Sequence, residues 1–146
     1  MQPFFNIHVY LHIFTHLFLN IMKELFIAGT DKTPEINLSV ENCRFEIKGA
    51  SFSDTVYEDI YKKVLDWIDN EMPSINCKIN CIFFINLLNS ITYKNLMQIL
   101  IKLTEYHKSG KDISVTWYFE GDDEDNGELA ENLSEVFDIP FTIKAV

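Results

Sequence analysis

Residues 81–100, CIFFINLLNSITYKNLMQIL, join a buried strand directly to a helix. The first part, 81–88, is apolar except for Asn86, and from Ile91 onward the apolar residues recur at helical spacing. So apolar a run is typical of a strand that lies inside a sheet rather than at its edge. The stretch therefore predicts a central strand over 77–88 that leads at once into a long helix packed on the sheet.

Small polar residues stand at the junction of this strand and this helix. Asn89 or Ser90 can cap the helix, because either side chain can accept a hydrogen bond from a backbone N–H two or three residues further on. The same position suits a phosphoryl group, because a helix N-terminus presents free N–H groups and the positive end of the helix dipole. Spacing does not separate a cap from a modification site, and both interpretations stand.

The rest of the chain predicts a mixed sheet with helices packed on it, in the order βββαβαβαβ from Met22 onward. Residues 35–40 and 44–48 alternate polar and apolar side chains and form a predicted hairpin. Thr55 and Glu58 have the spacing of a helix capping box. Strands are predicted at 25–27, 35–40, 44–48, 77–88, 113–119 and 139–143, and helices at 55–71, 91–107 and 128–137.

Residues 1–21 differ in composition from the rest of the chain. They contain no Asp, Glu, Lys or Arg, and ordinary globular composition begins at Met22. The polar load is high for a membrane span, and neither a basic region nor a small-residue cleavage site marks a signal peptide. Three interpretations remain for this apolar extension: an upstream translation artefact, a membrane-associating helix or a partner-binding helix. We expect 22–146 to form one domain.

The charge excludes some classes of partner. The 146 residues carry a formal net charge of −10, and the sequence pI is about 4.7. Nucleic acids and anionic membrane surfaces require clustered Lys and Arg, so neither is an expected partner, unless residues 1–21 contact a membrane. The cysteines, Cys43, Cys77 and Cys81, are odd in number and are interpreted as buried reduced thiols of a cytoplasmic protein.

The sequence predicts no catalytic set, no cofactor site and no metal site. His107 is the only histidine after residue 21, and its place at a helix end favours a capping or surface role. The acidic loop 120–127 resembles part of a calcium loop, with Asp122, Glu124 and Asn126 at the first, third and fifth positions. The twelfth position, which needs a bidentate carboxylate, is Leu133. We therefore interpret the loop as solvated or facing a partner.

The order and spacing of several short motifs resemble those of one bacterial family, the SiaC-family regulatory phosphoproteins. The resemblance covers 22–146. The residues that carry it are Gly29-Thr30, Thr33-Pro34-Glu35-Ile36, Gly49, Ser51-Phe52, Trp67, Asn89-Ser90, Lys94, the run 117–125, Gly127-Glu128 and Pro140-Phe141.

The resemblance implies a fold similar to the STAS domains of anti-sigma-factor antagonists, and a partner switch that is not an enzyme. A kinase and a phosphatase act on such a switch, and its unphosphorylated form activates a diguanylate cyclase and raises cyclic di-GMP. By position, Ser90 is the implied phosphoacceptor, where threonine is usual in the family, and Thr92 is the alternative. The implied partner-binding residues are Asn89, Lys94, Asp122, Asp123, Glu124 and Asp125.

Two other functions are also compatible with the sequence. One is a structural or interaction protein in which Ser90 is only part of a helix cap. The other is a small metal-dependent enzyme that uses the acidic loop, although the sequence lacks a cluster of His and carboxylate ligands.

Overall fold

The computed structural model describes residues 7–52 and 57–146, with the side chains of 15–22, 57 and 58 excluded. A short 3-10 turn, Met72–Ser74, follows the second helix. The helices are α1 (Ile7–Met22), α2 (Tyr57–Glu71), α3 (Ser90–Lys108) and α4 (Glu124–Val136), and the strands are β1 (Glu24–Ile27), β2 (Glu35–Ser39), β3 (Arg44–Ser51), β4 (Ile79–Leu88), β5 (Ile113–Phe119) and β6 (Phe141–Ala145).

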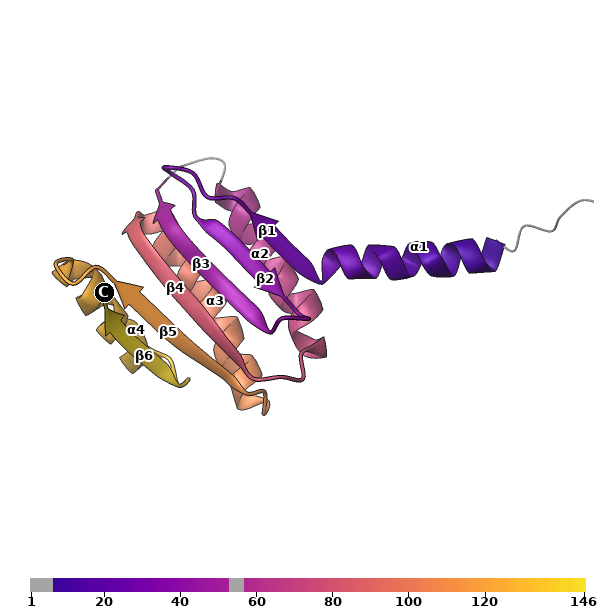
Figure 1. Ribbon diagram of the computed structural model, residues 1–146. Coiled ribbons are helices and arrows are strands. Elements are labelled where there is room, and N and C mark those ends of the chain that lie inside the picture. Colours follow the sequence, from indigo (N-terminus) through magenta and orange to yellow (C-terminus); the bar gives the residue numbers. More distant parts are fainter. Residues whose placement is uncertain (1–6, 53–56) are drawn as a thin grey trace, which may run out of the picture.

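The described strands form one six-stranded sheet in the order β1-β2-β3-β4-β5-β6. The first three strands are antiparallel neighbours, and β3 to β6 run parallel. Helices α2, α3 and α4 all lie behind the sheet in Figure 1. The register of β3 against β4 shifts at Gly49, whose φ of 111° is readily adopted only by glycine. Because β3, β4, β5 and β6 run parallel, their carboxyl ends lie at the same edge of the sheet.

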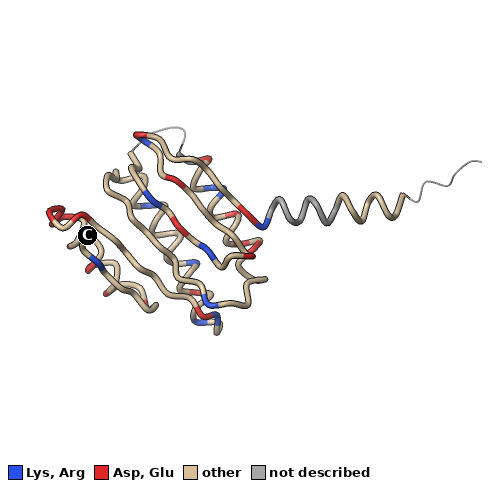
Figure 2. The backbone as a smooth tube through the Cα atoms, viewed as in Figure 1, with Lys and Arg blue, Asp and Glu red and all other residues tan. Residues whose placement is uncertain are grey.

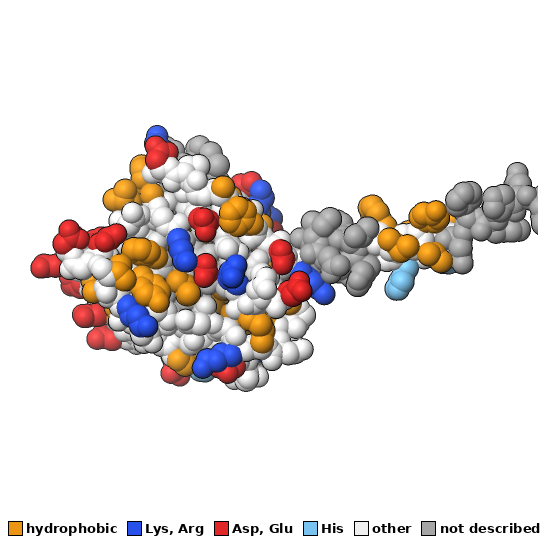
Figure 3. Space-filling view, viewed as in Figure 1, with side chains coloured by type: hydrophobic (Ala, Val, Ile, Leu, Met, Phe, Trp, Pro, Cys, Tyr) orange, Lys and Arg blue, Asp and Glu red, His pale blue; other side chains and the backbone are white. Residues whose placement is uncertain are grey.

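The core lies between the sheet and these three helices. Every second residue of β4 is buried, from Ile79 through Phe83 to Ile85, and the Phe83 ring stacks on Trp117 of β5 with the centroids 5.6 Å apart. The other face of the sheet is open. Its side chains mix hydrophobic groups with both signs of charge (Figure 3), and they include Phe84 and Tyr118, whose rings are in contact. The sheet thus packs as a two-layer structure with one solvated face.

The element order predicted from Met22 onward is confirmed, including the β2–β3 hairpin and the central position of β4. The last strand lies two residues later than predicted. The capping box at 55–58 falls outside the residues whose side chains are described. The largest difference is at α4, which begins at Glu124 rather than near residue 128. The acidic segment is therefore a short turn followed by the first turn of a helix.

The prediction of three reduced thiols is wrong, because Cys43 and Cys77 form a disulfide with their Cα atoms 6.3 Å apart. Cys77 also lies in the loop before β4 rather than on the strand beside Cys81. The pairing follows from topology: Cys43 directly precedes β3, and the parallel strand β4 starts next to it, with Arg44 opposite Asn80. Only Cys81 is a free cysteine in the described structure, and it is buried.

Helix α1 extends away from the sheet (Figure 1). Its described apolar side chains are exposed, among them Tyr10 and Phe14. In the part of the chain that the structure describes, no helix combines the length and the apolar character needed to cross a membrane.

We predict that residues 1–21 are dispensable for folding. The exposed side chains of α1 bury little apolar area on the domain, so they contribute little to its stability. A chain that starts at Met22 should melt within about 2 °C of the full chain in differential scanning calorimetry. A large fall in melting temperature would show instead that the extension packs on the domain.

Candidate functional site

The candidate site lies where β4 passes into α3, at the carboxyl edge of the parallel strands. Asn89 is the N-cap of α3, because its Oδ1 accepts the backbone N–H of Thr92 at 3.0 Å. Ser90 is therefore the first helical residue rather than the cap, and it is exposed. The first N–H groups of a helix have no intrahelical partner, and the N–H groups of Ser90 and Ile91 belong to this set. A group attached to Ser90 thus lies beside free backbone donors.

Thr92, one turn into the same helix, lies in a different environment. It is fully buried, and its hydroxyl donates to the carbonyl oxygen of Ser51 at 2.6 Å. The same hydroxyl is 2.7 Å from the Ser51 hydroxyl, which in turn is 2.8 Å from that of Tyr61. Thr92 therefore anchors the start of α3 to the end of β3, and it is inaccessible to a modifying enzyme in the folded protein.

The acidic residues lie at the same edge, after β5. Asp123 is the N-cap of α4, and its side chain accepts the N–H of Asn126 at 3.2 Å. Asn126 is buried and bridges two strands: it accepts from Trp117 Nε1 at 2.7 Å and donates to the Ile85 carbonyl at 2.6 Å. Gly127 is required here by close packing, because a Cβ would lie 2.9 Å from the ring of Phe119. The acidic turn is thus fixed rigidly beside the end of β4.

A groove of about 330 Å³ separates the end of β4 from the start of α4. It is lined by Asn86, Leu87, Leu88, Asp123, Asp125, Asn126 and Leu129. Leu87 is 55% exposed, and Phe52, Ile91 and Tyr93 are other exposed large side chains in the segments that meet at this edge. The edge therefore offers an apolar surface with carboxylates beside it. Exposed apolar side chains gathered in this way mark a surface that suits a protein partner.

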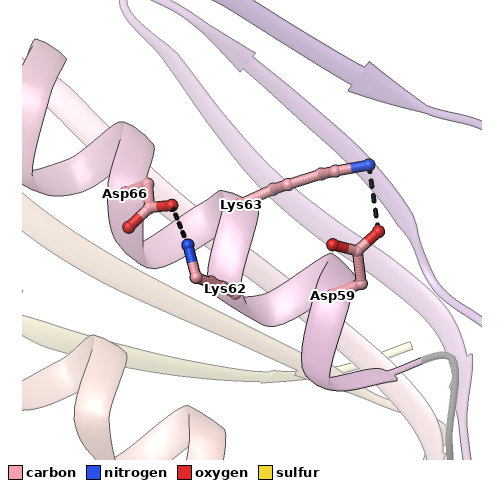
Figure 4. A network of polar contacts seen from close by, with 4 residues as sticks. All are labelled: Asp59, Lys62, Lys63 and Asp66. Atoms are coloured by element: carbon pink, nitrogen blue, oxygen red, sulfur yellow. Dashed lines mark hydrogen bonds and ion pairs between the residues drawn. The ribbon is translucent and has the colours of Figure 1, made fainter.

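The charges at this edge are not neutralised by the chain itself. Elsewhere lysines pair with carboxylates, as on α2, where Lys62 and Lys63 contact Asp66 and Asp59 at 2.9 and 3.2 Å (Figure 4). Among the residues with described side chains, no ion pair involves Lys94 or the four carboxylates at 122–125. Figure 2 shows the acidic residues gathered at one end of β5. These unpaired charges are available to a partner.

The described residues give no support for a metal site at this edge. No group of three or more His, Cys, Asp or Glu side chains capable of holding a metal occurs among the described residues. Asn126 is committed to Trp117 and Ile85, so it is unavailable as a ligand. Burial raises the pKa of the Cys81 thiol, which keeps it protonated and unreactive. His107 lies in the last turn of α3, at the far end of that helix from Ser90.

We predict that the acidic turn binds Ca²⁺ or Mg²⁺ no more tightly than the millimolar range. Asp122, Glu124 and Asp125 are exposed and form no preformed ligand cage, and Asp123 already caps α4, so ordering these carboxylates around a cation costs conformational freedom. Isothermal titration calorimetry with each cation checks this. A micromolar dissociation constant would contradict the prediction and favour the metal-dependent enzyme.

Comparison with known proteins decides the family. A family model described as SiaC family regulatory phosphoprotein matches residues 27–146. The chain belongs to this family. An uncharacterized protein of Pseudomonas aeruginosa is 31% identical over 124 residues, which cover 85% of this chain and 98% of that protein. The crystal structure of apo-SiaC from the same organism has a TM-score of 0.75 at 30% identity, and it covers 84% of this chain and 98% of that one.

A second solved structure bears on partners. It is the diguanylate cyclase SiaD in complex with its activator SiaC from Pseudomonas aeruginosa, and this SiaC-family chain matches it with a TM-score of 0.77 at 30% identity. The match covers 84% of this chain and 99% of that one. The SiaC-like fold is therefore one that carries a regulatory, activating role in a relative.

The residues that the sequence predicted for the SiaC-like site lie in two segments. Asn89, Ser90 and Lys94 belong to the start of α3, and of the residues 122–125 only Asp123 and Asp125 line the groove at the end of β4. Sequence reasoning missed Leu87, Ser51 and Asn126. No sequence signal marked Leu87, because 81–88 is apolar except for Asn86, and the break in burial alternation at Leu87 is visible only in the structure. Ser51 and Asn126 act through contacts with residues 41 positions away, and no local pattern reports such contacts.

Proposed function

We propose that this chain is a non-enzymatic, cytoplasmic partner switch: phosphorylation of Ser90 by a kinase, reversed by a phosphatase, controls its binding to a diguanylate cyclase. The observation that carries the proposal is the placement of an exposed serine at the first position of α3, two residues after the end of β4, which lines a groove of mixed leucine, amide and carboxylate side chains. Family membership and the SiaC–SiaD complex of Pseudomonas aeruginosa support the class of partner. Thr92 is the weaker candidate, because its hydroxyl is buried and hydrogen-bonded.

The unphosphorylated form is the one suited to binding. In that state the exposed side chains of Leu87, Ile91 and Tyr93 can be covered by an effector, with Lys94 and the acidic turn contacting its polar groups. A phosphoryl group on Ser90 adds about −1.5 to −2 charges at pH 7. An effector that covers the apolar surface must then strip water from the phosphate, which is costly unless an opposite charge replaces the water. The only arginine of the chain, Arg44, lies at the other end of β3. Lys94, one turn further along α3, can replace part of this water, but a Lys94 that contacts the phosphate is no longer available to the effector.

We predict that Ser90→Ala and Ser90→Asp differ in effector binding. Ser90→Ala should keep full effector binding and change the free energy of unfolding by less than about 0.5 kcal/mol, because Asn89 and not Ser90 is the cap. Phosphoserine at position 90 should weaken binding about 5- to 150-fold, and Ser90→Asp should do so less, because aspartate carries a single charge. Titration calorimetry measures the binding of each protein to the diguanylate cyclase that is recovered with it from its own cells. Chemical denaturation measures the free energy of unfolding of Ser90→Ala.

The matched control is Gln98→Glu, which adds the same charge as Ser90→Asp to an exposed position on the same helix. It should bind the effector as the wild type does. The proposal is contradicted if wild type, Ser90→Asp and the phosphoserine protein bind the effector equally and phosphopeptide mapping finds no phosphate on Ser90. Asn89 and Ser90 would then serve only to start the helix.

A further inference from the structure

A chain of three buried hydroxyl groups joins the start of α3 to two other elements. Tyr61 of α2, Ser51 of β3 and Thr92 of α3 are all fully buried. The Tyr61 and Ser51 hydroxyl oxygens are 2.8 Å apart, and those of Ser51 and Thr92 are 2.7 Å apart. The Thr92 hydroxyl also lies 2.6 Å from the Ser51 carbonyl oxygen. These contacts lie directly beneath the turn that carries Ser90.

The direction of each hydrogen bond in this chain can be assigned, because every hydroxyl has one proton to donate. Thr92 donates to the Ser51 carbonyl, which has no proton and can only accept. Thr92 must therefore accept from the Ser51 hydroxyl, and Ser51 must accept from Tyr61. The chain runs in one direction, from Tyr61 through Ser51 and Thr92 to a backbone carbonyl. Hydrogen bonds arranged head to tail polarise one another and hold a single arrangement of the groups.

This arrangement fixes the 89–92 turn more firmly than helix capping requires. The Ser51 carbonyl also accepts the N–H of Asn89 at 3.3 Å, so it holds both ends of the turn. The Asn89 side chain accepts a hydrogen bond from the N–H of Thr92. Valine would fill the volume at position 92 without bringing a hydroxyl that must be satisfied in the core. The Thr92 hydroxyl therefore serves to position the 89–92 turn rather than to bury apolar surface.

We propose that the Tyr61–Ser51–Thr92 chain positions Ser90, so that a phosphoryl group on Ser90 receives the free backbone N–H groups at the start of α3. The inference rests on the proposed function for the identity of the modified residue. Thr92 and Tyr61 are positioning residues that act through the backbone of the turn and touch neither kinase nor effector. Loosening the chain should change the environment of the phosphate even where the fold is retained.

The experiment uses the full chain with phosphoserine installed at position 90 during translation, so that no kinase is needed. Phosphorus NMR gives the second pKa of the phosphoserine, whose ordinary value is about 6. Backbone donors stabilise the dianion, so they should lower this pKa in the wild-type background by about 0.3–0.7, and this part of the shift should be lost in Thr92→Val. Lys94, which lowers the pKa, and the carboxylates at 122–125, which raise it, are the same in both backgrounds. Amide exchange at Thr92 and Tyr93, measured by proton NMR, should accelerate about tenfold in Thr92→Val.

Two further variants separate position from stability. Thr92→Ser keeps the hydroxyl and should restore both readouts. Thr104→Val removes another buried hydroxyl of α3, one that donates to the Leu100 carbonyl at 2.7 Å far from Ser90, and should change neither. If Thr92→Val does not fold, Tyr61→Phe removes the first donor of the chain with its packing retained, and should shift the pKa in the same direction.

Unchanged readouts in Thr92→Val, or equal changes in Thr92→Val and Thr104→Val, would overturn the proposal. A different result would contradict the proposed function alone. If the pKa and the exchange rates respond as expected but phosphoserine at position 90 leaves effector binding unaltered, the positioning role of the hydroxyl chain is supported and the proposed partner switch is contradicted.

Discussion

Replacing Asn126 with leucine is expected to lower the free energy of unfolding by about 2–6 kcal/mol. The change removes two buried hydrogen bonds and leaves the indole N–H of Trp117 and the carbonyl of Ile85 without partners. Each unsatisfied buried group costs about 1–3 kcal/mol, and leucine of similar size returns only part of this through apolar contact. Chemical denaturation followed by tryptophan fluorescence measures the loss.

The control for this substitution is Asn95→Leu. Asn95 donates to the Ile91 carbonyl at the surface of α3, where water replaces the lost bond, so the cost should stay below about 0.5 kcal/mol. A double-mutant cycle with Trp117→Phe then isolates the Trp117–Asn126 contact, with an expected coupling of about 0.5–3 kcal/mol. If Asn126→Leu unfolds at the same denaturant midpoint as the wild type, the Asn126 amide does not bridge the strands in solution.

The consequence of this bridge reaches the candidate site. Asn126 joins the last buried residue of β4 to β5 and to the first turn of α4, and Asp123 caps that turn through the N–H of Asn126. The groove beside Leu87 is therefore preformed rather than shaped by an incoming partner. A preformed surface loses less conformational freedom on binding, which favours affinity for an effector.

The sequence predicted the strand and helix order because hydrophobic periodicity is a local property. Residues 81–100 show this most plainly: the apolar run, the polar cap and the helical spacing lie within one stretch, and β4, Asn89 and α3 follow from them. The start of α4 was missed for a local reason. Five of the residues 120–125 are acidic, Gly121 lies within this run and Gly127 follows it, so the pattern resembled a loop. Asp at the cap and acidic residues in the first turn also favour a helix start.

Contacts between distant residues set the rest of the site. The Asn126 bridge, the Gly127–Phe119 approach and the Ser51–Thr92 contact depend on how α4 and α3 pack on the sheet. A sequence pattern carries no information on such pairs until the strand order is known. With β3 and β4 as parallel neighbours, the proximity of Cys43 and Cys77 does follow, because Cys43 directly precedes β3 and Cys77 lies two residues before the paired start of β4.

Reduction of the Cys43–Cys77 disulfide is expected to lower the free energy of unfolding by about 3–4 kcal/mol. The bond closes a loop with a sequence separation of 34 residues, and the chain-entropy estimate for a loop of that length gives this range. Guanidinium denaturation with and without dithiothreitol measures the difference. The variant with Cys43→Ser and Cys77→Ser should unfold like the reduced protein and should not respond to dithiothreitol.

Alkylation tests the bond directly. Under denaturing conditions, iodoacetamide should add one group to the oxidised chain, at Cys81, and three after reduction, as read by intact mass. Three groups without reduction would show that the pair is not bonded. The oxidation state of Cys43 and Cys77 also bears on the proposed cytoplasmic location, because glutathione keeps most thiols reduced in the cytoplasm. The disulfide ties the amino ends of β3 and β4, whereas Ser90 lies at the carboxyl edge, so reduction should lower stability and leave effector binding by the folded protein unchanged.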